Sequence, residues 1–377
     1  MKKAFLLCLT LLAATFGFAQ QQLATLNHND SIRVYYGADA LQQAHAAAVN
    51  GDIITLSPGV FNSLRITKAV TIRGAGMFAD TISGINNTIV NYEVEFDIPY
   101  DSLHHLTIEG IYFSSNVYYK KVFHPKFIKC YFQSFFYSYN NGNFNRDTNT
   151  LGSMYNATFV NSILTNWNNC NKARTPSNLA AWGAKNTTFV NSIILDIAEN
   201  NNAISGTLAY FYYTYSSSPD ILINSIVFVR DPNNIVYKSI NNCIIYTTAT
   251  TFNTGTNNAF STFYSIGINS QLGQQYFANA ANHYNSNFNS MAAVFKTFRG
   301  TFTDGETFEL QDSIAANYLG NDGTQVGIYG GFMPFDPRVS GLNIRRLDVA
   351  RRTTADGRLA IDIEVVNEES TNTTEEE

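Results

Sequence analysis

The chain has 377 residues, of which 14% are charged and 14% are aromatic, and its formal net charge is −5. It lacks the clustered basic surface that nucleic-acid binding requires, so we expect no nucleic-acid partner. Five acidic side chains lie in the last ten residues, at Glu368, Glu369, Glu375, Glu376 and Glu377. The remaining body is close to neutral and rich in hydrogen-bonding and aromatic side chains, a composition suited to binding glycans or other proteins.

Residues 1–19 have the pattern of a secretory signal peptide. Lys2 and Lys3 precede an apolar run from Ala4 to Ala14, and residues 17–19 supply small side chains before a cleavage site. The apolar run is too short for a membrane-spanning helix, which needs roughly twenty residues. We therefore expect the chain to be exported, either secreted or on the outer cell surface, with no transmembrane segment.

Three cysteines follow the signal peptide, at Cys130, Cys170 and Cys243. Their odd number and wide spacing predict neither a disulfide framework nor a zinc site of the paired-cysteine kind. Cys130 and Cys243 lie inside apolar strands, where a thiol behaves as a small core side chain.

A lead segment, residues 20–37, precedes one convincing helix over residues 39–50. We expect Asp39 to cap this helix, with Gln42 at the capping-box position and a glycine ending it. His45 lies on the apolar face of the helix. It could be a ligand, but a helix-face histidine without an acidic neighbour is more often structural.

Two short strands follow the helix, and each ends at a proline or glycine turn. The first is Gly51-Asp52-Ile53-Ile54-Thr55-Leu56-Ser57-Pro58-Gly59-Val60-Phe61, and the second is Ile66-Thr67-Lys68-Ala69-Val70-Thr71-Ile72-Arg73-Gly74-Ala75-Gly76. Together with the helix, these segments resemble the first turns of the pectate-lyase-like superfamily of right-handed parallel β-helices. The resemblance implies an all-β solenoid with an N-terminal capping helix.

A short phrase with a small third residue then recurs along the chain. It occurs as Ile108–Phe113, Ile128–Phe132, Val160–Leu164, Val190–Ile194, Ile223–Val227 and Asn241–Ile245, with third residues Gly110, Cys130, Ser162, Ser192, Ser225 and Cys243. A β-helix explains the repeat because equivalent residues stack on themselves, and asparagine can form an amide ladder. The spacings of 20, 32, 30, 33 and 18 residues fit bare turns and turns with an inserted loop. An antiparallel sandwich would not require a fixed third residue.

Residues 308–316 and 320–331 are similar to the last turn of bacterial secreted β-helix proteins. Ser313-Ile314-Ala315 stands where that signature usually has Ser-Pro-Ala. The resemblance covers roughly residues 38–331, and neither terminal motif carries catalytic residues in the superfamily. We place the β-helix domain at residues 38–336.

Residues 337–366 are expected to form a small β-hairpin unit. Segments 342–349 and 359–366 alternate apolar and polar residues, and Asp356-Gly357 is a tight-turn pair. The unit could dock on the last turn of the solenoid, or be the remnant of an attachment module. Residues 367–377 form an acidic tail too polar to pack, so we expect it to be disordered.

Three carboxylates, Glu93, Glu95 and Asp97, form the best candidate metal site. Strand alternation places them on one face, opposite Tyr92, Val94, Phe96 and Ile98. They could collect Ca²⁺ for a polysaccharide lyase, or form an ordinary solvated face. The pool for a catalytic base is Asp101, His104, His105, Lys120, Lys121, His124 and Lys126. No lyase or hydrolase motif connects these residues.

Aromatic side chains supply the candidate ligand-binding residues, because flat rings with polar tips suit sugars. They are Tyr137, Trp167, Trp182, Tyr212 and Tyr215. The alternative is that these rings pack in the core or under loops.

Three hypotheses follow. The first is a secreted or cell-surface, non-catalytic β-helix protein that binds a glycan or another surface component. The second is a divergent Ca²⁺-assisted polysaccharide lyase. The third is a structural or adhesive spacer. The sequence does not specify an oligomeric state.

Overall fold

The structure is a computed structural model. It describes residues 22–29, 31–80, 84–137, 153–165, 167–168, 183–195, 221–229, 239–247, 261–268, 288–298, 306–338, 342–349 and 361–367.

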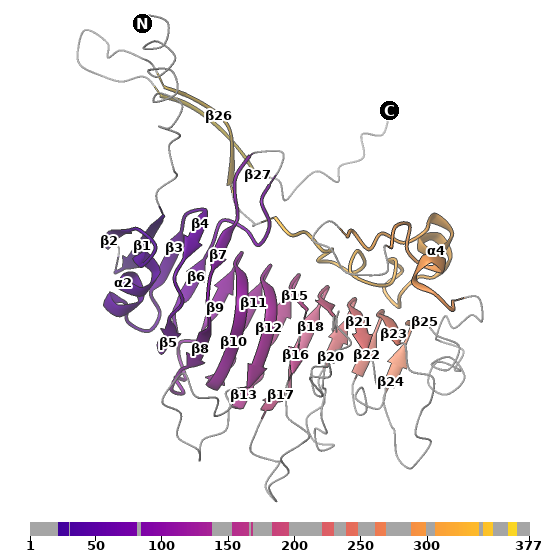
Figure 1. The fold of residues 1–377 in the computed structure, drawn as a ribbon. Helices are drawn as coiled ribbons and strands as arrows, with labels where there is room; N and C mark the ends of the chain where they lie inside the picture. The colour runs from indigo at the N-terminus through magenta and orange to yellow at the C-terminus, as the bar shows by residue number, and fades with distance from the viewer. Residues whose placement is uncertain are drawn as a thin grey trace, which may run out of the picture.

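Two long sheets contain all the described strands except β26 and β27 (Figure 1). The first sheet contains, in spatial order, β2 (Ser31–Tyr36), β1 (Leu23–His28), β3 (Ile53–Leu56), β6 (Thr71–Arg73), β9 (Thr107–Glu109), β11 (Lys126–Ile128), β14 (Thr158–Val160), β18 (Thr188–Val190), β20 (Ile221–Ile223), β22 (Ser239–Asn241) and β24 (Ser261–Phe263). The second sheet contains β4 (Gly59–Phe61), β5 (Arg65–Ile66), β7 (Thr88–Val90), β8 (Val94–Asp97), β10 (Tyr112–Phe123), β12 (Tyr131–Tyr137), β13 (Ser153–Tyr155), β15 (Ile163–Leu164), β16 (Trp167–Asn168), β17 (Gly183–Lys185), β19 (Ile193–Ile194), β21 (Ile226–Val229), β23 (Ile244–Thr247) and β25 (Ile266–Ile268).

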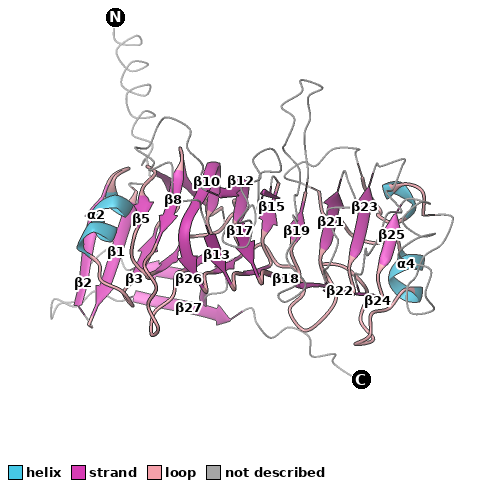
Figure 2. Cartoon of the chain, turned by 90° about the horizontal axis from the view of Figure 1, so that it is seen from below, coloured by secondary structure: helices cyan, strands magenta, loops and turns pink. Residues whose placement is uncertain are grey.

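The chain alternates between the two sheets. From β11 onward, each strand of the first sheet is followed after two residues by a strand of the second. Within these two sheets all described pairings are parallel except those of β1 with β2 and with β3. Figures 1 and 2 show the strands stacked along one axis. The predicted all-β class with long parallel sheets is confirmed, and the arrangement is consistent with a solenoid-like β-helix.

The register explains the recurring phrase and corrects one member of it. Phe127 lies beside Phe159, and Phe159 lies beside Phe189, so the predicted intervals of 32 and 30 residues are confirmed. In the first phrase, however, Ile108 pairs with Phe127 rather than with Ile128. The predicted alignment of this first phrase was therefore wrong by one residue. Gly110, its third residue, has the left-handed backbone that Lys129 has in the next turn.

The turn between the two sheets has a left-handed residue in every repeat. Lys129, Asn161, Asn191, Asn224, Asn242 and Tyr264 have φ between +46° and +54°. Asparagine and aspartate adopt this left-handed backbone more readily than most other residues that carry a side chain. The recurrent asparagine is therefore explained by backbone conformation.

The small residue that follows belongs to a buried hydrogen-bond ladder, which we call the small-residue ladder. Its members are Cys130, Ser162, Ser192, Ser225, Cys243 and Ser265, all fully buried. Each backbone N–H donates to the side chain of the next member, at 3.1–3.4 Å. The hydroxyl of Ser192 also donates to the carbonyl oxygen of Val190 at 2.9 Å. Small polar side chains are required because the site has no spare volume.

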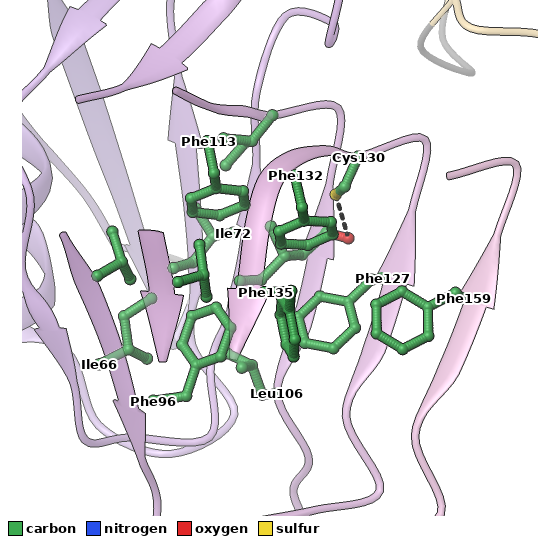
Figure 3. Close-up of a cluster of buried hydrophobic side chains, with 14 of the residues drawn as sticks. Ile66, Ile72, Phe96, Leu106, Phe113, Phe127, Cys130, Phe132, Phe135 and Phe159 are labelled. Atoms are coloured by element: carbon green, nitrogen blue, oxygen red, sulfur yellow. Dashed lines mark hydrogen bonds between the residues drawn. The ribbon is translucent and has the colours of Figure 1, made fainter. Parts of the chain in front are cut away.

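Aromatic rings fill the interior between the sheets (Figure 3). Phe127, Phe159 and Phe189 stack along the axis, with ring centroids 4.8 and 5.0 Å apart. Phe132 stacks in the same way on Phe113 at 4.9 Å. Because the phenylalanines of successive turns are paired in register, their rings form continuous columns in the core.

The lead segment forms an antiparallel hairpin that extends the first sheet, a feature that sequence analysis missed. Helix α2 (Ala40–Ala47) packs against this hairpin and β3. The predicted cap was wrong, since Asp39 makes no side-chain cap bond and instead accepts from Asn62 Nδ2 at 2.6 Å. Gln42 donates to the carbonyl oxygen of Ser63 at 2.6 Å. The role of α2 as the cover of the first turn stays a prediction.

The predicted last turn is not a turn of the solenoid. Residues 308–331 contribute no strand to either described sheet, and the final described strands are β24 and β25. Helix α4 (Asp312–Asn317) and the short helix η3 (Met291–Ala293) instead place apolar residues against β25. The glycine-rich sequence resembles a strand turn because both need positive φ.

Residues 320–338, which we call the return strap, run back along the column of asparagine turns. Asn242 donates to Asn321 Oδ1 at 2.9 Å. Farther back, Asn191 Nδ2 donates to the carbonyl oxygens of Ile328 and Gly330, at 2.8 and 2.7 Å. The expected amide-to-amide ladder was therefore wrong at Asn191 and Asn242, whose amides bind the strap.

The C-terminal hairpin is present as two antiparallel strands. β26 (Leu342–Val349) pairs with β27 (Ile361–Asn367), close to the predicted bounds. The predicted Asp356-Gly357 turn and the acidic tail beyond residue 367 lie outside the described residues.

Candidate functional site

An ion-pair cluster lies on the outer face of the second sheet, where β5, β8 and β10 adjoin. Arg65 Nε lies 3.0 Å from Glu95 Oε1, and its Nη2 donates to Asp97 Oδ2. Lys120 Nζ lies 3.5 Å from the same Asp97 oxygen. The Glu95 side chain is only 4% exposed, because the guanidinium covers it. We call these four residues the Arg65 cluster.

The predicted alternation around these carboxylates was wrong at its first residue. Val94, Phe96 and Ile98 are buried as expected, but Tyr92 is 63% exposed and has φ +64°. This left-handed residue interrupts the alternation, so β8 begins only at Val94. Glu93 lies apart from the Arg65 cluster and accepts from the Tyr118 hydroxyl at 3.3 Å.

Calcium binding at Glu93, Glu95 and Asp97 stays a prediction. Across the described ranges, no three His, Cys, Asp or Glu side chains converge as metal ligands. A cation would have to displace Arg65 from both Glu95 and Asp97, leaving the guanidinium without partners.

An aromatic column of one exposed and two half-buried rings adjoins β8, β10 and β13, and we call it the outer aromatic column. It consists of Tyr100, Phe123 and Tyr155. Phe123 stacks on Tyr155 with a centroid distance of 5.1 Å and an interplanar angle of 7°. Tyr100 meets Phe123 at 5.2 Å and 80°, and it is 60% exposed. Phe123 therefore contacts both rings, Tyr155 in a stacked arrangement and Tyr100 in a nearly perpendicular one.

Hydrogen-bonding groups border the outer aromatic column. His124 and Asn156 directly follow Phe123 and Tyr155 in left-handed conformations. Asn186 Nδ2 donates to Asn156 Oδ1 at 2.9 Å, and the ring of His105 lies 4.9 Å from that of His124. The face thus combines flat rings with amide and imidazole groups.

Lys121 adds a positive charge to the border of the outer aromatic column. Lys121 Nζ lies 5.8 Å from the centroid of the Phe123 ring. Lys126, which directly follows Pro125 in the chain, is also exposed. Both lysines belong to the predicted pool of bases, and Lys121 contacts the aromatic column, whereas Lys126 begins β11 of the first sheet.

Two other members of the predicted base pool have structural contacts. Asp101 Oδ2 accepts from Asn50 Nδ2 at 2.9 Å and lies 3.1 Å from His104 Nδ1. The backbone N–H of Leu103, followed by the His104 ring, holds the pKa of Asp101 well below its usual range. These contacts tie the loop after β8 to the end of α2.

The predicted ligand-binding aromatics are only partly located. Tyr137 is the last residue of β12, and Trp167 begins β16, so their backbones lie in the second sheet. Trp182, Tyr212 and Tyr215 lie outside the described residues. The structure therefore leaves the binding roles of all five as predictions.

His45 has the structural role that its position indicated. Its side chain is buried, and Nε2 accepts from the backbone N–H of Thr67 at 3.3 Å. Burial, followed by the charge of Lys68, lowers the pKa of His45 to about 4. Lys68 Nζ in turn donates to three carbonyl oxygens at the end of α2, at 2.6–2.8 Å.

The expected core position of two cysteines is confirmed. Cys130 and Cys243 are free and fully buried, and burial raises the pKa of both thiols to about 12. Neither is suited to nucleophilic chemistry. Cys170 lies outside the described residues.

Sequence reasoning missed Arg65 and the outer aromatic column. A signal for the column was present, since Phe123-His124 and Tyr155-Asn156 both place an aromatic residue before a turn residue. No comparable signal marked Arg65, because its partners come from a neighbouring turn thirty and more residues away.

Comparison with protein-family models, with curated proteins and with solved structures finds no match for this chain. Among the described helices, none is long and apolar enough to cross a membrane.

Proposed function

We propose that this chain is an exported, right-handed parallel β-helix protein of the pectate-lyase-like type that binds a glycan without cleaving it. The binding surface is the outer aromatic column, Tyr100, Phe123 and Tyr155, with its polar border. Export and the superfamily assignment rest on the signal-like N-terminus and on the sequence of the first turns.

The exposure of Tyr100 is the observation that carries this proposal. A tyrosine that is 60% exposed and packed nearly perpendicular to Phe123 offers aromatic surface to a ligand at little entropic cost. Sugar rings present flat C–H surfaces that fit such a face. The stacking of Phe123 on Tyr155 holds the platform in place.

The polar border supports a carbohydrate over a purely apolar ligand. Asn156 and Asn186 are linked by a hydrogen bond and lie one turn apart. Successive turns of a parallel stack lie about 4.8 Å apart, close to the length of one sugar residue. A chain of sugars running along the axis would therefore meet equivalent groups at each turn.

Affinity electrophoresis in gels containing single polysaccharides tests the proposal. We expect retardation by at least one neutral or acidic polysaccharide, and Tyr100→Ala should reduce the affinity by about 1–2 kcal/mol, or roughly tenfold. Tyr36→Ala is the matched control, because Tyr36 is an exposed tyrosine (56%) on β2, outside the column. Equal retardation of Y100A and wild type would refute binding at this surface.

A calcium-assisted polysaccharide lyase is the second candidate. The observation that favours it is the meeting of Arg65 and Lys120 with two carboxylates on one outer face. Lyase action on uronate polymers with Ca²⁺ would generate unsaturated products that absorb ultraviolet light. No increase in absorbance across a panel of uronate polymers would eliminate this candidate.

The spacer hypothesis instead predicts loss of cell attachment on gene deletion, without any glycan binding.

A further inference from the structure

Two exposed histidines occupy equivalent positions in consecutive turns of the stack. Thr107 of β9 pairs with Lys126 of β11, and these strands are neighbours in the first sheet (Figure 1). His105 and His124 each stand two residues before this pair, and both side chains are exposed. Their ring centroids lie 4.9 Å apart, with an interplanar angle of 45°. We call His105 and His124 the histidine pair.

Backbone hydrogen bonds fix the segments that carry the histidine pair. The N–H of Lys126 donates to the carbonyl oxygen of Leu106 at 2.9 Å, and the N–H of His124 donates to that of Tyr155 at 2.8 Å. His124 has φ +51°, the left-handed conformation that Asn156 has at the equivalent position one turn later. The separation of the two rings is therefore set by the stacking of the turns.

This separation matches that of two imidazoles bound to one metal ion. A ligating histidine nitrogen lies about 2.0–2.1 Å from the metal, and its ring centre lies about 1.1 Å behind that nitrogen, so each centroid is about 3.2 Å from the metal. With an angle of about 90–109° at the metal, the two centroids are then about 4.5–5.2 Å apart. The observed 4.9 Å falls within this range.

The ring nitrogens of the pair are not engaged by acidic side chains of the described residues. The ion pairs of histidine in these ranges belong to His28 and His104. His124 Nδ1 instead lies 3.4 Å from Asn156 Nδ2. This contact orients the ring and leaves Nε2 for a metal, in the way that an outer partner orients a metal-bound histidine.

We propose that His105 and His124 bind one divalent late transition metal, Cu²⁺ or Zn²⁺. Imidazole is a ligand for these metals, whereas Ca²⁺ takes oxygen ligands, so the site differs in chemistry from the three-carboxylate calcium candidate. Across the described ranges no third His, Cys, Asp or Glu side chain converges with the pair. The remaining positions on the metal are therefore open to water or to an oxygen of a second ligand. Phe123 directly precedes His124, so these positions lie at the border of the outer aromatic column.

Titration of the untagged protein with CuCl₂, ZnCl₂ or CaCl₂ alone tests this site. Two imidazoles near the charge of the exposed Lys126 give a moderate affinity. We expect Cu²⁺ to bind with a Kd in roughly the micromolar range, Zn²⁺ to bind about tenfold or more weakly, and Ca²⁺ not to compete. Lowering the pH from about 7.5 to about 5.5 should weaken Cu²⁺ binding at least roughly tenfold, because ligating histidines must be neutral. The electron paramagnetic resonance spectrum of bound Cu²⁺ should show coupling to two nitrogens.

His105→Asn and His124→Asn separate the pair from the rest of the chain. Asparagine is compatible with the left-handed backbone at position 124, as Asn156 shows one turn later, so the fold should persist. Each variant should lower the Cu²⁺ affinity at least roughly tenfold and remove one nitrogen from the coupling pattern. His104→Asn is the matched control, because His104 adjoins the pair in the chain but interacts with Asp101; it should bind Cu²⁺ like wild type.

Three results would overturn the proposal. They are a wild-type protein that binds no Cu²⁺ up to about 1 mM, a wild-type Cu²⁺ spectrum without nitrogen coupling, and H105N or H124N protein that binds as tightly as wild type. The first two results need no variant, and circular dichroism checks the fold of each variant. None of them bears on glycan binding, which Tyr100→Ala tests in the absence of metal.

Discussion

At the residue scale, the small-residue ladder shows how a single position can control a repeat. The N–H of Ser162 has one partner in this ladder, the hydroxyl of Ser192 in the next turn, at 3.2 Å. The same hydroxyl donates to a carbonyl oxygen of its own turn. One side chain therefore binds two backbone groups, a buried N–H of the turn before and a carbonyl oxygen of its own turn.

Replacing Ser192 with alanine should lower the free energy of unfolding by about 1–3 kcal/mol, because the buried N–H of Ser162 loses its acceptor. Ser192→Cys should cost less, since Cys130 and Cys243 occupy equivalent positions of the same ladder. Urea denaturation of the three proteins measures this difference. Equal stability of S192A and wild type would show that the ladder contributes no net energy.

His45 should make stability depend on pH. Its pKa is about 4 in the folded protein and ordinarily 6.5, so between these values the unfolded chain binds a proton that the folded protein does not. The stabilisation is fully present above about pH 6.5 and is lost as the pH falls towards 4. We expect a loss of about 2–3 kcal/mol across this window. His45→Gln should flatten the dependence in urea unfolding curves, and an unchanged slope would contradict the assignment.

At the scale of elements, the return strap fastens turns that are far apart in the sequence. Asn191 binds two of its carbonyl oxygens, although 137 and 139 residues separate the partners. Burial has the largest single effect on the pKa of Asp336 and raises it, but hydrogen bonds from Arg338 and the charge of Lys129 together lower that pKa below its ordinary value. Lys129 lies still farther back along the stack. The strap thus crosses turns that themselves contact only their neighbours.

Asn191→Gly isolates the contribution of the strap bonds. Glycine keeps the left-handed backbone and removes the amide, so the two buried carbonyl oxygens lose their donor. We expect a loss of about 1–3 kcal/mol. Asn191→Ala should lose roughly 1–2 kcal/mol more, because alanine is strained at φ +46°. If N191A and N191G have the same midpoint in thermal unfolding, backbone strain is not part of the effect.

At the scale of the whole molecule, stability is a sum over stacked turns. Each turn contacts its two neighbours, so a central turn is held on both sides and a terminal strand on one. The phenylalanine columns and the small-residue ladder both run through β14 and β18. Among the described strands, β2 pairs with β1 alone.

Hydrogen exchange should therefore be graded along the stack. In dilute protein, amides of β14 and β18 should exchange at least roughly tenfold more slowly than those of β2. A tenfold difference in rate corresponds to a difference of about 1.4 kcal/mol in the free energy of opening. Peptide-resolved mass spectrometry measures this gradient. Uniform protection from β2 to β18 would mean that the solenoid opens as one unit.

The sequence by itself determined the class of this fold, the two buried cysteines, the structural histidine and the C-terminal strand pair. Each of these follows from local pattern, because alternation, small residues and turn residues act within a few positions. The first phrase was nevertheless misplaced by one residue, since glycine and lysine can fill the same left-handed site.

Only the tertiary structure decided which distant residues meet. It brought Arg65 onto Glu95, aligned Tyr100 with Phe123 and Tyr155, and laid the return strap along the asparagine turns. Stacking sets these contacts through the sequence offset between paired residues of successive turns, which is 30, 33 and 18 residues from β14 to β22. The recurring phrase indicates part of that register, but it does not indicate which outward-facing side chains of neighbouring turns come into contact, so the candidate site emerges only when the turns are stacked.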